Sequence, residues 1–162
     1  MTACSEQPPA QPSCRVNASA VSNHQGVAAC IVSVNGKLLV TQLESGLYDL
    51  PIIKNISSTS SGSKSAQCAA HQSMWLQTGL NVEVQNVVGA QADGTWLFGC
   101  KLSSGFDGSE APFDPPHWSS DNVKKIMFIN PFDIELYNWA QRDHFDIMRD
   151  AYILQGNYQK AE

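Results

Sequence analysis

Charged residues are scarce in this sequence of 162 residues, and basic ones are the scarcest. Only 15% of the residues are charged, and 10 lysines and arginines stand against 15 acidic residues, which gives a net charge of −5. Because nucleic acids are bound largely through their phosphates, this balance argues against DNA or RNA as a partner.

No apolar run approaches the roughly 18 residues of a membrane-spanning helix. The length fits a single domain.

The sequence also lacks a recognisable metal-binding pattern. Its four histidines are scattered, and its five cysteines match no zinc-site spacing. Apart from Cys4, the cysteines form an even set that suits two disulfides in an oxidising compartment, with the connectivity left open. Buried free thiols explain the same residues equally well, because two of them lie in apolar strand-like runs. The four cysteines concerned are Cys14, Cys30, Cys68 and Cys100.

The N-terminal residues suggest an anchor and a tether. Ala3-Cys4 resembles the end of a bacterial lipobox, in which the cysteine after a small residue is lipidated. The polar, Pro-rich stretch that follows is typical of an unfolded linker. We therefore expect residues 1–22 to be a flexible tether and residues 23–157 a folded domain. The protein would then be a periplasmic, membrane-anchored lipoprotein; the alternative is a chance Ala-Cys pair in a cytoplasmic protein.

Strand patterns occupy the first half of the expected domain and recur after residue 80. The apolar run 26–34 is followed by Asn35-Gly36 and then by 37–43, which predicts a hairpin. Residues 80–90 alternate between apolar and polar, and the turn Asp93-Gly94 separates them from a second strand at 95–102. These patterns predict two antiparallel pairs.

Helix signals lie between these pairs and at the end of the chain. Ser65 is a good N-cap and Gly79 a good left-handed terminator, which predicts a helix between them. A last strand is expected at 122–129. Pro131 then suits the first position of a helix, so we expect the chain to end in one or two helices.

Two segments resemble the Nudix (MutT-like) hydrolase family. "GLYDLPIIK", Gly46 to Lys54, resembles its G-x-W-x-L-P-G-G-K stretch, and "AAHQSMWLQTGL", Ala69 to Leu80, resembles its A-A-x-R-E-L-x-E-E-T-G-L helix. The order of elements from about residue 26 to residue 154 is also similar. The resemblance implies an α+β fold, an α/β/α sandwich around a mixed β-sheet.

The charged residues of the Nudix box are missing from this chain. In the family, glutamates at i, i+3 and i+4 leave one face of the helix and hold the magnesium that assists diphosphate hydrolysis. Neutral or basic residues stand at the five corresponding positions, so we expect no catalytic residue and no metal cofactor. These degenerate box positions are Lys64, Gln72, Ser73, Leu76 and Gln77.

The resemblance therefore implies an inactive or strongly impaired domain that binds a small phosphorylated ligand or a protein partner. A homodimer is also consistent with it. The ligand would lie over the sheet beside the loop that precedes the box helix. The candidate residues there are Gln42, Tyr48, Lys54, Trp96 and Phe98. The alternative is a divergent hydrolase for nucleoside diphosphate-type substrates, with magnesium held by carboxylates outside the box. The acids available for that role are Glu44, Asp49, Asp93, Asp107, Glu110 and Asp114.

Overall fold

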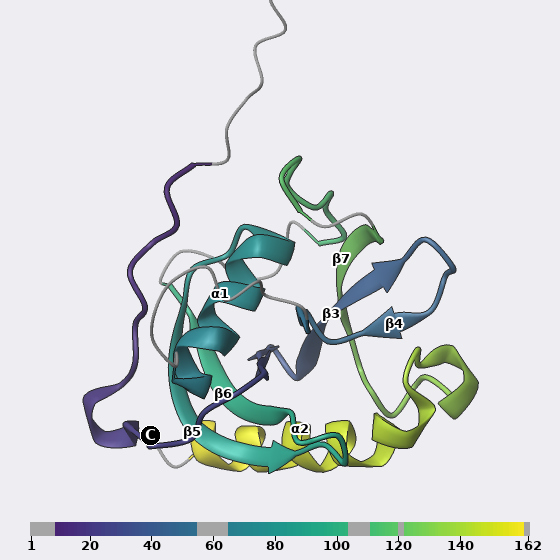
Figure 1. Ribbon diagram of the computed structural model, residues 1–162. Coiled ribbons are helices and arrows are strands. Elements are labelled where there is room, and N and C mark those ends of the chain that lie inside the picture. The colour runs from purple at the N-terminus through teal and green to yellow at the C-terminus, as the bar shows by residue number, and fades with distance from the viewer. Residues whose placement is uncertain (1–8, 55–64, 104–110, 120–121, 161–162) are drawn as a thin grey trace, which may run out of the picture.

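The computed structural model describes residues 9–54, 65–103, 111–119 and 122–160. Within these residues, seven strands form two small sheets and two α-helices lie on opposite sides of them (Figure 1). Residues 55–64, which include the box position Lys64, lie outside the description, as do Asp107 and Glu110. The arrangement confirms the expected α/β/α sandwich.

The first sheet is mixed and has the order β1-β6-β5. Strand β1 (Ala28–Ile31) runs parallel to β6 (Trp96–Leu102), which pairs in the antiparallel direction with β5 (Val82–Ala90). The register of β5 shifts between Val84 and Val87. This pair confirms the expected hairpin around Asp93-Gly94.

The second sheet is antiparallel and is built on β3 (Lys37–Leu43). One edge of β3 is shared by β2 (Ser33–Val34) and β4 (Tyr48–Asp49), while β7 (Val123–Ile129) follows the other edge. The turn between β2 and β3 uses positive φ angles of 51° at Asn35 and 73° at Gly36, as the Asn-Gly pair predicted.

The expected first strand is divided between the two sheets. Residues 28–31 pair with β6, whereas residues 33–34 pair with β3, and Val32 lies at the change of partner. The prediction of one long hairpin was therefore wrong in its extent. A continuous apolar run indicates burial on both faces, but it does not identify the neighbouring strand.

Each side of the strand layer has its own hydrophobic core. Helix α1 (Ala66–Thr78) packs through Met74 on a cluster that includes Cys30 and Leu39. Helix α2 (Phe145–Lys160) packs through Met148 on a second cluster that includes Ile31. Successive residues of a strand point to opposite faces, so β1 contributes to both clusters. The two cores hold α1 and α2 apart.

The expected helix at Pro131 does not form. Asn130 begins a turn instead, because its side-chain oxygen accepts a hydrogen bond of 2.9 Å from the Phe132 amide. Trp139 is extended and bridges to Tyr48, which is incompatible with helix. Two short 3-10 helices, Leu136–Asn138 and Arg142–His144, precede the one terminal α-helix, α2 (Phe145–Lys160).

Part of the expected tether contacts the domain. Its short 3-10 helix, Ala18–Ala20, follows residues that lie along β5, where the Val84 amide donates to the Arg15 carbonyl and the Asn17 amide donates to the Val84 carbonyl, each at 2.9 Å. A disulfide joins Cys14 to Cys68 on α1. This segment therefore covers the outer edge of β5.

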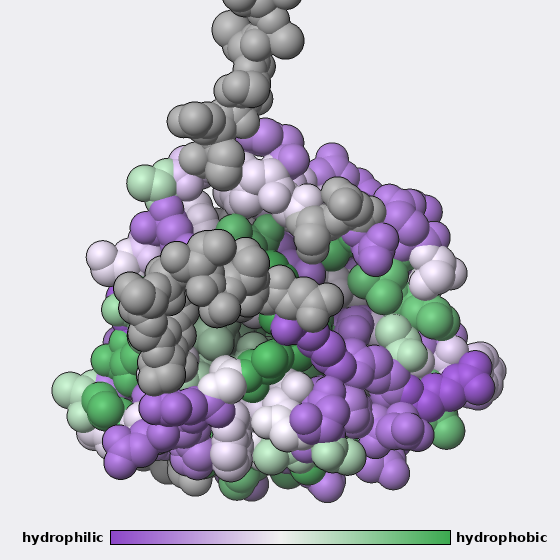
Figure 2. All heavy atoms as spheres, viewed as in Figure 1, coloured by the Kyte–Doolittle hydropathy of each residue, from purple (hydrophilic) through white to green (hydrophobic). Residues whose placement is uncertain are grey.

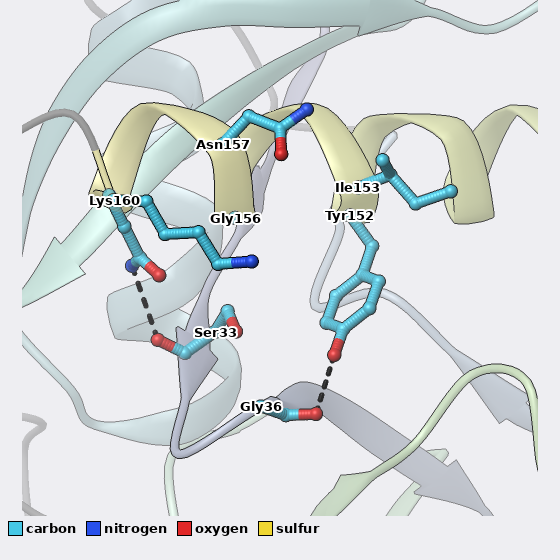
Figure 3. Close-up of a pocket in the computed structure, with 8 residues that line it drawn as sticks. Ser33, Gly36, Tyr152, Ile153, Gly156, Asn157 and Lys160 are labelled. Atoms are coloured by element: carbon cyan, nitrogen blue, oxygen red, sulfur yellow. Dashed lines mark hydrogen bonds between the residues drawn. The ribbon is translucent and has the colours of Figure 1, made fainter.

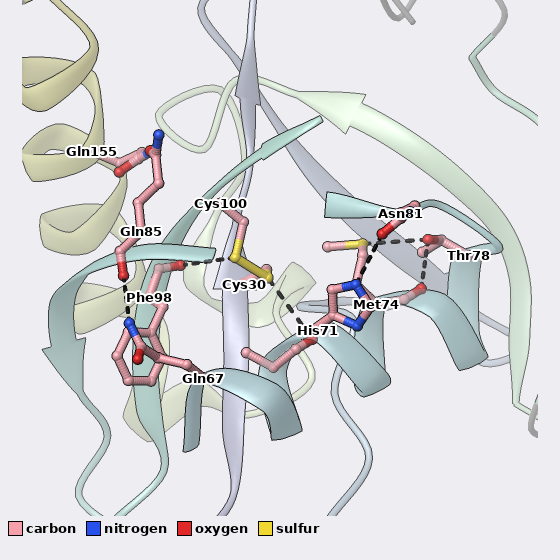
Figure 4. Close-up of a disulfide and its surroundings, with 11 residues drawn as sticks. Cys30, Gln67, His71, Met74, Thr78, Asn81, Gln85, Phe98, Cys100 and Gln155 are labelled. Atoms are coloured by element: carbon pink, nitrogen blue, oxygen red, sulfur yellow. Dashed lines mark hydrogen bonds between the residues drawn. A yellow bond between two sulfur atoms is a disulfide. The ribbon is translucent and has the colours of Figure 1, made fainter. Parts of the chain in front are cut away.

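A second disulfide joins neighbouring strands of the first sheet. Cys30 on β1 is bonded to Cys100 on β6, and both residues are fully buried in the core on the α1 side (Figure 4). Polar side chains are buried here as well. Gln67 donates a hydrogen bond of 3.1 Å to the Gln85 carbonyl, and Gln155 donates one of 3.4 Å to the Gln85 side chain. The structure thus selects one connectivity from those that the sequence left open.

The surface is mixed in character. On the face shown in Figure 2, hydrophobic residues form small groups separated by hydrophilic ones. Neither α-helix in the described part of the chain has the length and apolar character needed to span a bilayer.

Candidate functional site

The ends of α1 are set by the two residues that the sequence indicated. The Ser65 hydroxyl accepts a hydrogen bond of 3.2 Å from the Cys68 amide, which caps the N-terminus. Gly79 adopts a left-handed φ of 73°, and its amide donates to the Trp75 carbonyl. The box positions Gln72, Ser73, Leu76 and Gln77 are therefore on a regular helix.

Two of these positions hold the preceding loop against the helix. The Ser73 hydroxyl accepts a hydrogen bond of 3.2 Å from the Ile53 amide, and Gln77 Nε2 donates 3.0 Å to the Ile52 carbonyl. Ser73 and Gln77 are both buried. Residues four apart share one face of a helix. The loop at Ile52 and Ile53, which we call the box loop, therefore lies across the face that carries Ser73 and Gln77.

This helix face does not fit a divalent metal ion. Magnesium selects hard oxygen ligands and is usually held by carboxylates. Ser73 and Gln77 offer neutral groups that already contact the loop, and Leu76 offers no ligand atom. Among all described residues, no group of three histidine, cysteine or acidic side chains is placed to hold a metal. The donor set therefore disagrees with the ion that the family resemblance implies.

A cavity of about 360 Å³, which we call the box cleft, lies beside the loop. It is bounded by β3, β4, the box loop, the C-terminal part of α1, the start of β7 and the loop before α2. Its size falls within the range of small-molecule sites, roughly 300–1,000 Å³. The lining residues are Thr41, Leu43, Asp49, Leu50, Ile52, Ile53, Lys54, Gln77, Asn122, Val123 and Gln141.

Asp49 is the acidic residue of the cleft lining. Its carboxylate accepts hydrogen bonds from the Leu50 amide at 2.8 Å and from Gln141 Nε2 at 3.2 Å. Burial raises the pKa of Asp49, and these two bonds together with the nearby Lys54 offset only part of that effect. A carboxylate with a raised pKa in a cleft is a recognised mark of a functional site.

Lys54 links the cleft to the β5–β6 turn. Its ammonium group lies 2.9 Å from Asp93 Oδ2 and 2.8 Å from Gln141 Oε1. The hydrogen bond from Lys54 holds the pKa of Asp93 well below its usual range. Asp93, Lys54, Gln141 and Asp49 thus form one continuous polar chain, of which Lys54, Gln141 and Asp49 line the cleft.

Of the five expected ligand residues, Lys54 lines the box cleft. Gln42 and Tyr48 are paired across β3 and β4, where Tyr48 packs on the α2 side. Phe98 is fully buried in the α1-side core, and Trp96 lies against His24 with a ring separation of 4.1 Å. The other four residues are not part of the cleft lining.

The acids of the hydrolase alternative are also dispersed. Asp114 pairs with Lys125, and Glu44 is exposed in the turn after β3. Asp49 lines the cleft, and Asp93 lies outside the lining, connected to Asp49 through Lys54 and Gln141. Asp107 and Glu110 lie outside the described residues.

Sequence reasoning missed Gln141, which contacts both Asp49 and Lys54. It comes from the loop before α2, 92 residues beyond Asp49. The loop is fixed there because the Ala140 amide donates 2.8 Å to the Tyr48 carbonyl. A single glutamine outside any motif carries no sequence signal for such a position.

A second cavity of about 420 Å³ lies between α2 and the β2–β3 turn (Figure 3). Tyr152 donates to the Gly36 carbonyl, and Gln159 Nε2 donates 3.3 Å to the Ser33 carbonyl. Lys160 stands at its edge, with its side chain toward Ser33. Because these side chains bond the hairpin to α2, we assign this cavity a packing role.

Comparison with solved structures identifies the fold. An ADP-ribose pyrophosphatase from Streptococcus suis matches with a TM-score of 0.55 at 18% identity, over 78% of this chain and 90% of that one. A Nudix hydrolase from Nitrosomonas europaea matches with a TM-score of 0.58 at 10% identity, over 82% and 90%. A UDP-X diphosphatase matches with a TM-score of 0.52 at 12% identity, over 85% and 66%.

Comparison at the level of sequence finds less. No protein-family profile matches this chain, and no curated protein is significantly similar to it. The arrangement of helices and strands and these structural matches nevertheless agree on the fold. The chain has the fold of the Nudix hydrolases.

Proposed function

We propose that this chain is a catalytically inactive Nudix-fold domain that binds a small ligand in the box cleft. One observation carries the proposal: the α1 face that holds the metal in the family is bonded to the chain's own loop, through Ser73 to Ile53 and through Gln77 to Ile52. The scaffold around this face remains intact.

The energetic argument concerns the missing carboxylates. With an effective dielectric near 20, one carboxylate about 4 Å from a divalent ion contributes roughly 8 kcal/mol of attraction. A hydroxyl and an amide cannot replace several such charges, and Leu76 replaces none. Loop carboxylates are also a less rigid platform than a helix face. The fold therefore keeps a cleft without the helix carboxylates that position a metal for hydrolysis.

The test is an assay for turnover with ADP-ribose, a UDP-sugar and simple nucleoside diphosphates, each with magnesium and with manganese. An active Nudix hydrolase serves as the positive control. We expect no product above the metal-only blank. Release of product by this chain that scales with its concentration and survives further purification would contradict the proposal.

A divergent hydrolase remains the second candidate, favoured by Asp49. Its buried carboxyl has a raised pKa and lines the cleft, which suits an acid or a base. This candidate predicts turnover that disappears in Asp49→Asn and persists in Asp114→Asn, a carboxylate outside the cleft lining. The inactive-domain proposal predicts no turnover in any of the three proteins.

We also propose that the protein works in an oxidising compartment, anchored through Cys4 as a bacterial lipoprotein. The disulfides Cys14–Cys68 and Cys30–Cys100 support the oxidising compartment, because cytoplasmic reductants keep most thiols reduced. The anchor rests on the resemblance of Ala3-Cys4 to a lipobox. Fractionation and labelling with a palmitate analogue in cells test it. Loss of the label in Cys4→Ser is expected, and an unlabelled cytoplasmic protein would contradict the proposal.

A further inference from the structure

The box cleft is lined by one carboxylate, Asp49, and one ammonium group, Lys54. A second carboxylate, Asp93, lies outside the lining and pairs with Lys54. Asp93 is partly exposed, and Lys54 bonds to it directly at 2.9 Å. The direct ion pair is therefore between Lys54 and Asp93, while Asp49 receives its hydrogen bonds from neutral amides.

Lys54 is poorly placed to bind an added anion. Its ammonium group contacts both Asp93 and Gln141, so an incoming phosphate would compete with an existing carboxylate and an existing amide. No other lysine or arginine lines the cleft among the described residues. A diphosphate bound here without a metal would also lie beside the Asp49 carboxylate, which is an unfavourable pairing of like charges.

Asp49 can accept further hydrogen bonds. A carboxylate offers about four lone-pair sites, and the Leu50 amide and Gln141 Nε2 account for one bond to each oxygen. Bonds from a charged donor to a carboxylate are roughly twice as strong as those between neutral groups. The strongest new partner that this carboxylate can take is therefore a cationic nitrogen.

Part of the remaining lining is apolar. Leu43, Ile52, Ile53 and Val123 are among the residues that line the cleft, although polar groups make up the larger share of its surface. Ligand sites combine apolar contacts with a few polar groups that fix the orientation of the ligand. A small ligand with a charged nitrogen and a short apolar body suits this mixed lining.

We propose that the box cleft selects a small organic cation, with an ammonium or amidinium nitrogen donating to Asp49 and an apolar body lying on Leu43, Ile52 and Val123. The proposal rests on the proposed binding function of the cleft. It replaces the phosphorylated ligand that the family resemblance implies with a ligand of opposite charge.

Three probes of nearly equal shape test the charge preference: benzamidinium, benzamide and benzoate. Each is titrated into the isotope-labelled full chain, and nuclear magnetic resonance follows the Leu50 and Lys54 amides and the side-chain amide of Gln141. We expect the cation to shift these signals saturably, the neutral probe to bind at least about tenfold more weakly, and the anion not to saturate.

Two variants with opposite expected effects identify the charged residue that attracts the cation. Asp49→Asn should weaken benzamidinium binding by about tenfold to a hundredfold, because it removes the charged acceptor. Lys54→Met should strengthen it, because it removes the competing cation. Asp150→Asn on the exposed part of α2 is the matched control and should behave as the unmodified chain. The folded state of each variant is checked from the dispersion of the same spectra.

Several results would overturn the proposal. They are tighter binding of benzoate than of benzamidinium, equal binding of the three probes, no response to any of them, or an unchanged affinity in a folded Asp49→Asn variant. The hydrolysis assay is separate: turnover of a diphosphate together with specific cation binding would refute inactivity and leave the ligand class standing.

Discussion

Gln77 Nε2 lies 3.0 Å from the carbonyl oxygen of Ile52, so a box position contributes a hydrogen-bond donor where the family pattern has a carboxylate acceptor. Position 77 therefore donates a hydrogen bond instead of accepting one. The loop carbonyl that Gln77 holds would repel a carboxylate at the same place. This relationship predicts how the helix responds when the family residue is restored.

Gln77→Glu is expected to destabilise the fold by about 1–3 kcal/mol at neutral pH, because a buried acceptor would then face the Ile52 carbonyl. The introduced carboxyl can donate only when protonated, so its pKa should be raised in the folded state. Its contribution to stability is then present at low pH and lost as the pH rises. Urea unfolding at pH 5 and pH 8 measures both effects.

Gln77→Leu is the control for this substitution. It also removes the donor but introduces no titrating group, so its loss of stability should not change between the two pH values. If Gln77→Glu and Gln77→Leu showed the same pH dependence, the assignment of the hydrogen bond at Ile52 would be wrong.

Asp49 and Asp93 should affect stability in opposite directions as the pH changes. Burial raises the pKa of Asp49 above its ordinary 3.8, so the folded state holds that proton more tightly than the unfolded state. Protonated Asp49 therefore contributes its full stabilisation below about pH 3.8, and this stabilisation is lost as the pH rises through the raised pKa of Asp49 in the folded state. Asp49→Asn should flatten this decline in the unfolding free energy.

The pKa of Asp93 is lowered chiefly by its hydrogen bond from Lys54, so its contribution has the opposite sign. Stability is present above the ordinary carboxyl pKa and lost as the pH falls toward the lowered value. Because the pair is partly exposed, the effect should stay below about 1 kcal/mol. Asp93→Asn should remove it, and urea titrations between pH 2.5 and pH 7 compare the two variants.

Local patterns predicted α1 and the two tight turns because each depends on residues close in sequence. Ser65, Gly79 and the Asn35-Gly36 pair act through their own backbone geometry. The box cleft could not be predicted in the same way. Gln141 reaches Asp49 only because an extended loop crosses β4, and Lys54 finds Asp93 on a distant turn.

Two other expectations show the same limit. The Pro131 segment has a helical pattern, but the side chain of Asn130 stabilises a turn there, and the pairing of Trp139 with Tyr48 keeps the chain extended. The run 26–34 shows burial without showing that its two halves join different sheets. Contacts between distant segments decided both outcomes, as tertiary context often overrides local preference.

The two disulfides should differ in their reactivity. Cys14 is exposed, whereas Cys30 and Cys100 are fully buried. We expect dithiothreitol to release two thiols from the native protein at Cys14–Cys68, in addition to any at Cys4, and to release the others only on unfolding. Peptide mapping after rapid alkylation assigns each thiol. Release of Cys30 and Cys100 first would contradict the burial.

Loss of the Cys14–Cys68 bond should also be costly. It closes a span of 54 residues, and the chain-entropy relation gives about 4 kcal/mol for a loop of that size. The double variant Cys14→Ser/Cys68→Ser should therefore unfold at a lower urea concentration. If its midpoint were unchanged, the contacts of residues 15–20 along β5 would have to hold the segment without the covalent link.

Gly99 and Gly89 provide a matched pair for the core between β6 and α2. A Cβ atom at Gly99 would lie 1.8 Å from Gln155 Oε1, whereas one at Gly89 would meet its nearest neighbours at 3.6 Å. Gln155 is almost completely buried, so it cannot turn away without losing its contact with Gln85. We therefore expect Gly99→Ala to cost about 1–3 kcal/mol and Gly89→Ala to stay within about 0.5 kcal/mol.

The double variant Gly99→Ala/Gln155→Ala tests the cause, because shortening Gln155 removes the obstacle. The cost of Gly99→Ala should be smaller in this background, which gives a coupling of about 0.5–3 kcal/mol in a double-mutant cycle followed by urea unfolding. Additive losses would mean that Gly99 is required for its backbone rather than for the space above it. Because the strand conformation of Gly99 is open to other residues, we expect coupling.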